Sequence, residues 1–231
     1  MRGVVLRLNL RAGVSSCERR DEAMNRCARC SAELETPLGC SACGALAVLA
    51  DDPGPFAVLG IDPAYAIDPQ ELRRRLVRFS RMTHPDFFAT ADEEQRLRAE
   101  RATALLNEAY ATLSDDVARA DHLVETLGGP DENVERAMPQ EFLMEVLEWN
   151  ETLEEAREPE AVPDTKLEAL QRDLQDRRAR TLAEIARRLT PLPAHGSPAL
   201  RDVRRELNAV RYVDRALRQI EGLRLSRAEA R

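Results

Sequence analysis

The chain has 231 residues, a formal net charge of −7, 32% charged residues and only 4% aromatic residues. This length allows one or two domains with a substantial buried core. The few aromatic residues argue against a β-sandwich or barrel, the abundant Ala, Leu, Glu and Arg favour helices, and the negative charge argues against general nucleic-acid binding.

The sequence predicts no membrane segment. Its longest uncharged run, 36–50, has 15 residues and contains two cysteines, whereas a bilayer span needs roughly 20 apolar residues. Lys166 is the only lysine among 34 basic residues, which indicates the codon usage of a GC-rich bacterial genome. We therefore expect a cytoplasmic bacterial protein.

Composition divides the chain into four regions. Residues 1–23 show no hydrophobic period, and we expect a disordered extension or a start that truly lies at Met24. The remaining regions are a four-cysteine segment, a set of short helices ended by Gly128-Gly129-Pro130, and three longer helices, at 24–50, 51–130 and 131–231.

The first chemical motif is a pair of C-x-x-C sequences, Cys27 with Cys30 and Cys40 with Cys43. Two such turns bring four thiolates together in the tetrahedral arrangement of a closed structural zinc site. A rubredoxin-like iron site and a redox dithiol are the alternatives, although no βαβ unit of the redox class is readable here. The segment is too small to build its own core, so we expect the metal to supply its folding energy. Cys17 lies outside this pattern and is interpreted as an incidental thiol.

A basic amphipathic helix is predicted at 70–83. It begins after Asp68-Pro69 and ends at His84-Pro85-Asp86, because proline disfavours helix in the residue before it. One face carries Leu72, Leu76 and Phe79, and another carries Arg74, Arg78 and Arg81.

The next helix is expected to begin at Asp86 or Thr90 and to pack antiparallel to the first. Its buried side is predicted to contain Leu97, Leu106, Ala109, Tyr110 and Leu113. Taken alone, the His-Pro-Asp sequence is as compatible with an ordinary structural turn as with a functional motif. The three arginines are likewise compatible with a face that is only solvated. The clustering of these arginines without intervening acids favours a docking surface.

A second amphipathic helix is predicted at 140–158. Its core-facing stripe repeats at alternating spacings of four and three residues and consists of Phe142, Val146, Trp149, Leu153 and Ala156. The helices around 165–189 and 199–225 carry similar apolar stripes, which completes a three-helix bundle. Arg211 and Tyr212 lie beside the stripe of the last helix, where we expect them to extend the binding face described next.

The outer face of the 140–158 helix mixes apolar and acidic side chains. It contains Leu143, Met144, Leu147, Glu148, Glu151 and Glu155. A helix that only packed on a core would be polar there, so this face predicts a partner site, and its charge predicts a basic partner. The alternative is that another helix or a dimer mate covers Leu143 and Leu147.

From Cys27 onward the chain resembles the HscB family, the J-type co-chaperones of iron–sulfur cluster assembly. The resemblance is carried by HPDFF at 84–88, LLNEAY at 105–110, FLMEVLE at 142–148 and VRYVD at 210–214. It implies an L-shaped, all-α protein with a J-domain helical hairpin and a C-terminal three-helix bundle. The four-cysteine front end resembles the eukaryotic and some bacterial members, and its role stays open between stabilising the fold and mediating self-association as a homodimer.

The resemblance also implies partners and site residues. His84, Pro85 and Asp86, supported by Arg74, Arg78 and Arg81, would dock on a DnaK/HscA-type chaperone and stimulate its ATPase. The scaffold, called IscU in bacteria, would bind the outer-face residues listed above together with Tyr212. The chain itself would not be an enzyme, because no Gly-rich phosphate loop is present. A general J-protein that delivers unfolded clients is the alternative function.

Overall fold

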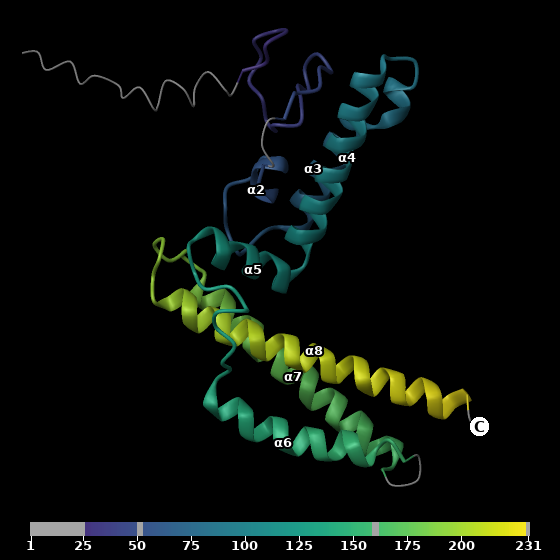
Figure 1. Ribbon diagram of the computed structural model, residues 1–231, viewed down its shortest axis with the longest axis vertical. Coiled ribbons are helices and arrows are strands. Elements are labelled where there is room, and N and C mark those ends of the chain that lie inside the picture. The colour runs from purple at the N-terminus through teal and green to yellow at the C-terminus, as the bar shows by residue number, and fades with distance from the viewer. Residues whose placement is uncertain (1–25, 50–52, 159–161, 230–231) are drawn as a thin grey trace, which may run out of the picture.

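The computed structural model describes residues 26–49, 53–158 and 162–229; the predicted extension 1–23, with Cys17, lies outside these ranges. Its helices form two arms that meet at an angle, as Figure 1 shows. The predicted all-α, L-shaped fold is therefore confirmed. The elements are α2 (Pro55–Val58), α3 (Pro69–Thr83), the 3-10 turn η1 (Pro85–Phe88), α4 (Glu93–Ser114), α5 (Asp116–Thr126), α6 (Gln140–Glu155), α7 (Asp164–Arg188) and α8 (Ala199–Glu229).

Helices α3 and α4 form the hairpin of the first arm. The carboxylate of Asp68 accepts a hydrogen bond from the N–H of Gln70 at 2.9 Å, and Pro69 occupies the first turn, so α3 begins where the sequence predicts. Leu72 and Phe79 are buried against α4. At the far end, the hydroxyl of Thr103 donates to the carbonyl of Thr83 at 2.9 Å, which ties the tip of α3 to α4.

Two expectations for α4 are wrong. The helix begins at Glu93, because the carboxylate of Asp92 accepts from the N–H of Gln95 at 2.8 Å and η1 intervenes before it. Leu97 is 59% exposed rather than buried. The buried seam runs through Ala99 and Ala102, and a residue two positions before Ala99 points about 200° away from it at 3.6 residues per turn.

Helices α6, α7 and α8 form the second arm. Phe142, Trp149 and Leu153 of α6 are buried in one cluster with side chains of α7 and α8, as the periodicity predicts. The buried guanidinium of Arg227 donates to the carbonyls of Ala156 and Val162, both at 2.9 Å, and so closes the end of the bundle. None of the helices in the described ranges combines the length and apolarity needed to cross a bilayer.

The two arms share a hydrophobic core. Helix α5 lies at the base of the first arm (Figure 1). Its Leu123 and Val124 lie in the same buried cluster as Ile185 of α7 and Leu200 and Val203 of α8. This cluster also contains Leu72, Phe79 and Leu106 of the α3–α4 hairpin and crosses the boundary expected near residue 130. Apolar burial therefore joins the arms directly.

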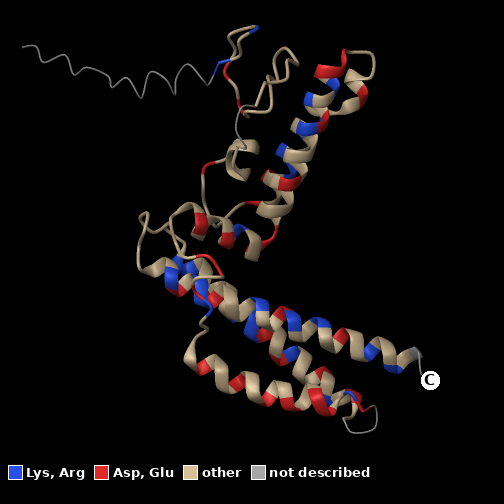
Figure 2. Ribbon diagram, viewed as in Figure 1, with Lys and Arg blue, Asp and Glu red and all other residues tan. Residues whose placement is uncertain are grey.

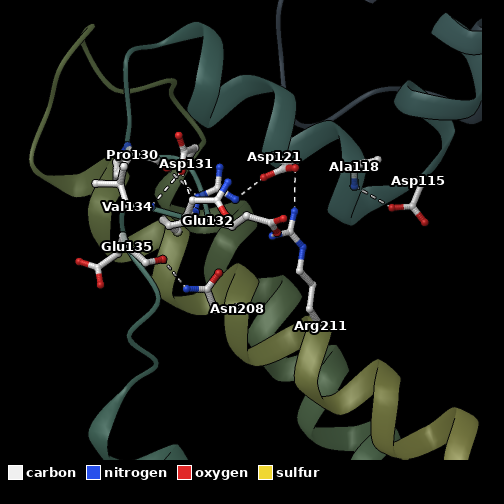
Figure 3. Close-up of polar contacts among 12 residues, drawn as sticks. Asp115, Ala118, Asp121, Pro130, Asp131, Glu132, Val134, Glu135, Asn208 and Arg211 are labelled. Carbon is white, nitrogen blue, oxygen red and sulfur yellow. Dashed lines mark hydrogen bonds and ion pairs between the residues drawn. The ribbon is translucent and has the colours of Figure 1, made fainter.

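A set of polar side chains, which we call the junction cluster, surrounds this contact (Figure 3). It consists of Asp121, Glu132, Glu135, Arg204, Arg205, Asn208 and Arg211. The carboxylate of Asp121 on α5 pairs with Arg204 and Arg211 of α8, the latter at 2.7 Å. Arg204 also donates to the carbonyl of Pro130 at 2.7 Å, which holds the start of the linker on α8.

Glu135 and Asn208 fix the rest of that linker. The side-chain amide of Asn208 donates to the carbonyls of Glu135 and Ala137 at 2.8 and 3.0 Å. The N–H of Ala137, and then the guanidinium of Arg205, hold the pKa of Glu135 below its ordinary value. Glu135 therefore contributes stability above its ordinary pKa, and this contribution is lost as the pH falls through the lower folded-state value.

The substitution Asp121→Asn should destabilise the protein by about 1–3 kcal/mol, because it leaves the guanidinium of Arg204, only 3% exposed, without its anionic partner. Chemical denaturation followed by circular dichroism measures the loss. The control is Glu154→Gln, which removes a solvent-exposed ion pair to Arg157 and should cost less than about 1 kcal/mol. Equal losses in the two variants would show that the junction cluster has no special role.

Candidate functional site

The His-Pro-Asp turn lies at the free tip of the α3–α4 hairpin. His84 ends α3 with extended backbone angles, as expected for the residue before a proline. Its Nδ1 accepts from the N–H of Asp86 at 3.3 Å and lies 3.5 Å from the Asp86 carboxylate. Both side chains are exposed, so the turn presents an imidazole edge and a carboxylate together to solvent.

The three predicted docking arginines share the outer face of α3 and are exposed. Arg74 pairs with Glu71 at 2.9 Å and with Asp68 at 3.5 Å, and Arg78 pairs with Glu35 at 2.6 Å. Arg81, in the last turn before His84, has no ion-pair partner among the described residues. Of the three, Arg81 is therefore the guanidinium whose charge is most available to a partner.

The outer face of α6 lies on the other arm, where acidic residues follow the helix (Figure 2). Leu143, Met144 and Leu147 are between 45% and 68% exposed, so no helix of the described chain covers them. Helix α6 contains six glutamates and no basic residue. The predicted mixed apolar and acidic surface is present, and the alternative of an intramolecular cover is wrong.

Tyr212 reaches this face from α8. Its hydroxyl lies 2.8 Å from Nδ2 and 3.0 Å from Oδ1 of Asn150, and its ring packs edge-on against Phe142 with centroids 6.0 Å apart. Arg211, which was expected beside it, belongs to the junction cluster instead, where Asp121 and Glu132 hold its guanidinium. Neighbouring residues on a helix point about 100° apart, which separates the two side chains.

The four predicted metal ligands come together near the first arm. The Sγ atoms of Cys27, Cys30, Cys40 and Cys43 all lie within 4.8 Å of one another. The distances Cys27–Cys43 and Cys30–Cys40 are both 3.6 Å. A tetrahedral ion with metal–sulfur bonds of about 2.3 Å would place its ligands about 3.8 Å apart, so the donor set fits a closed four-thiolate site.

The two cysteine pairs fold in the same way. The N–H of Cys27 donates to the carbonyl of Ala32 at 2.8 Å, and the N–H of Cys40 donates to that of Ala45 at 2.9 Å. Each turn needs a left-handed residue after its second cysteine, supplied by Ser31 and Gly44.

Backbone hydrogen bonding also prepares a ligand. The N–H of Arg29 donates to the Sγ of Cys27 at 3.4 Å and lowers the pKa of this thiol to about 6. The thiolate is the form that binds a metal, so this hydrogen bonding favours the ligating form of Cys27, while contacts with the neighbouring Sγ atoms raise the pKa of Cys30.

The hairpin between the cysteine pairs docks on the first arm, which the sequence did not indicate. Leu38 is completely buried in the shared core, and the hydroxyl of Thr36 donates to the carbonyl of Val58 at 2.7 Å. Gly60 has φ +63°, and a Cβ there would lie 2.1 Å from the carbonyl oxygen of Glu35. The segment was expected to be too small for a core of its own; in the described residues 26–49, Leu38 instead packs into the core of the first arm.

Comparisons with known proteins agree with this architecture. The family model described as "HSCB C-terminal oligomerisation domain" matches residues 138–221. The Co-chaperone protein HscB homolog of Shewanella baltica is 30% identical over 168 residues, covering 72% of this chain and 95% of the relative. The crystal structure of human co-chaperone protein HscB has a TM-score of 0.68 at 21% identity, covering 85% of this chain and 96% of that one. Chaperone HscB from Vibrio cholerae has a TM-score of 0.61 at 25% identity, covering 75% and 99%.

A His-Pro-Asp helical hairpin joined to a three-helix bundle defines a J-type co-chaperone. The bundle match, together with the likeness that covers 95% of the Shewanella relative, identifies the family: the chain belongs to the HscB family.

The cysteine site should bind one metal ion per chain, measured by elemental analysis after dialysis against a weak chelator. Cys40→Ser should leave well below one ion per chain and lower the melting temperature, because a site that binds metal only when folded stabilises the fold. Cys17→Ser is the matched control and should retain the full complement. Full metal content in Cys40→Ser, or equal loss in both variants, would contradict the assignment of the ligands.

Proposed function

We propose that this chain is a co-chaperone of iron–sulfur cluster assembly in the bacterial cytoplasm. Its C-terminal bundle binds an IscU-type scaffold protein, and its His-Pro-Asp hairpin stimulates the ATPase of a DnaK/HscA-type chaperone. Membership of the HscB family supports this function. The observation that carries it is the uncovered outer face of α6, on the opposite arm from the His-Pro-Asp tip (Figure 1).

The scaffold-binding surface has an apolar centre and an acidic margin. Leu143, Met144 and Leu147 supply the apolar area that a partner buries, with Tyr212 at its edge, while Glu148, Glu151 and Glu155 surround it. Neither Glu148 nor Glu151 pairs with a basic residue in the described chain, and Glu155 has one loose contact to Lys166 at 3.5 Å. A scaffold surface with an apolar patch and basic margins complements this arrangement.

The chaperone-binding surface has the opposite charge. His84, Pro85 and Asp86 form its tip, and Arg74, Arg78 and Arg81 extend it along α3. An acidic surface of the chaperone complements the arginines, and the rigid turn presents the Asp86 carboxylate without internal cover. The chain holds no phosphate loop, so ATP hydrolysis belongs to the chaperone and the chain is not itself an enzyme.

The two surfaces would work together as a tether. A scaffold held on α6 is kept near the chaperone held on α3, which raises its effective concentration at the chaperone's peptide site without any new contact. Stimulated ATP hydrolysis then closes the chaperone on the scaffold. The positions of the arms are set by the junction cluster and the shared core.

We propose that the metal of the four-cysteine site is zinc. Four thiolates without an open coordination position suit a closed structural zinc site, and zinc carries no redox chemistry. When bound, the ion crosslinks the ends of the hairpin that docks on the first arm. A colourless sample that contains zinc is expected, whereas a coloured sample would indicate iron.

The deciding experiment is ATP turnover by the cognate chaperone with this protein, with and without scaffold. The wild type should stimulate turnover, and scaffold should increase this further. His84→Gln should abolish the stimulation. Leu143→Ala combined with Leu147→Ala should weaken scaffold binding by about 10- to 100-fold and remove only the synergy, because it truncates the apolar centre.

The matched control is Leu225→Ala, which truncates an exposed leucine of α8 that lies outside the proposed faces. It should behave as the wild type in both measurements. If stimulation requires His84 but does not change when scaffold is added or when the two leucines are substituted, the chain is a general J-protein that delivers unfolded clients. No stimulation by folded protein would reject the chaperone assignment.

A further inference from the structure

The outward face of α3 contains an apolar side chain among its arginines. Arg74, Val77, Arg78 and Arg81 follow one another at helical spacing, opposite the buried Leu72 and Phe79. Val77 is 45% exposed. The face is therefore basic with an apolar centre rather than uniformly charged.

A second exposed apolar side chain lies at the tip. Phe87 is 71% exposed and is the only aromatic among the large exposed apolar side chains of the described residues. Its ring meets that of His84 edge-on, with centroids 6.2 Å apart and planes at 74°. Its N–H donates to the carbonyl of His84 at 3.1 Å, so the aromatic ring is held beside the His-Pro-Asp turn.

The arginines alone offer a partner little net gain. Arg74 and Arg78 already pair with Glu71 and Glu35, so a partner's carboxylates would exchange one exposed ion pair for another. Such pairs contribute roughly 0–1 kcal/mol each. Burial of exposed apolar area displaces no ion pair, and aromatic side chains, Phe included, are enriched at protein interfaces.

We propose that Val77 and Phe87 are apolar anchors of the chaperone-docking surface and set the affinity of the chain for its DnaK-type partner. The partner surface that fits them is acidic opposite Arg81 and contains an apolar pocket for the Phe87 ring. This inference rests on the proposed function, because Val77 and Phe87 are assigned to the interface with the chaperone that the proposed function requires.

Single exposed apolar residues are common on protein surfaces and need no partner to explain them. Phe87 and Val77 differ from Leu225 or Val134 in their position: Phe87 follows the His-Pro-Asp turn directly and contacts His84, and Val77 lies one helical turn before Arg81 on the same face of α3. Continuity with that turn selects the chaperone as the occupant of this face.

The test is a titration of the full-length protein into the chaperone ATPase assay, with binding also measured directly by calorimetry. Phe87→Ala should raise the half-saturating concentration about 10-fold and Val77→Ala about 3-fold, with the maximal rate unchanged. Phe87→Leu should recover most of the affinity. Increasing salt should weaken the binding of Phe87→Ala and Val77→Ala as steeply as that of the wild type. The affinity of Arg81→Ala should depend less on the salt concentration.

Leu225→Ala is the matched control and should leave the half-saturating concentration unchanged. Scaffold binding and far-UV circular dichroism should be the same for every variant, which separates lost docking from lost folding. If the wild type stimulates the ATPase and both Phe87→Ala and Val77→Ala keep its half-saturating concentration, this inference is overturned and the proposed function is intact. A Phe87→Ala variant that lowers the maximal rate at unchanged affinity would also overturn it. Absence of His84-dependent stimulation in the wild type would reject the proposed function and this inference together.

Discussion

The packing of α5 against the beginning of α8 determines the geometry of the whole molecule. Leu123 and Val124 enter a core that α7 and α8 complete, and Asp121 pairs with two arginines of α8 beside it. Apolar burial supplies most of the stability of such a contact, whereas the ion pairs fix its orientation. Without it, the arms would be joined only by the linker after Gly128, and the distance between the two proposed binding surfaces would fluctuate. The effective concentration on which a tether depends falls when that distance is not held.

The four-cysteine segment near the N-terminus is likewise joined to the first arm by apolar burial and an ion pair. Its hairpin is closed at both ends by cysteine pairs and contributes Leu38 to the core, while Glu35 pairs with Arg78 of α3. The free energy of metal binding is therefore not confined to the cysteines, because ordering the hairpin also orders the residues that pack on α2 and α3. This makes the segment a structural part of the first arm.

Local chemistry made much of this structure predictable. The Asp68-Pro69 start of α3, the proline that ends it, and the apolar stripe through Phe142 and Trp149 act within one or two helical turns, so the sequence displays them. The convergence of the four cysteines was predictable because two C-x-x-C turns leave little freedom for their sulfur atoms.

Other features depend on contacts between distant segments. Leu97 is a different case, because the helical period alone places it on the far side: it lies nine residues before Leu106, which is about 180° around the helix. Arg211 was assigned to the wrong surface because its partner Asp121 lies 90 residues away. The docking of Leu38 has no local signal, since a single leucine in a short hairpin has no period.

The net charge of −7 conceals opposite charges on α3 and α6, one helix in each arm, and this difference bears on how the chain would orient its partners. Helix α6 has six glutamates and no basic residue, whereas α3 has five arginines and one acidic residue (Figure 2). Under the proposed function, a basic scaffold surface is attracted to α6 and repelled by α3, and an acidic chaperone surface has the reverse preference. Charge would thus keep each partner from occupying the other's site. Because surface charges act over about 10 Å at 0.1 M salt, this discrimination would operate during encounter, before the apolar contacts form. Affinity would then come from the exposed leucines and methionine of α6 on one arm and from Val77 and Phe87 on the other, which separates the selection of partners from the strength with which they are held.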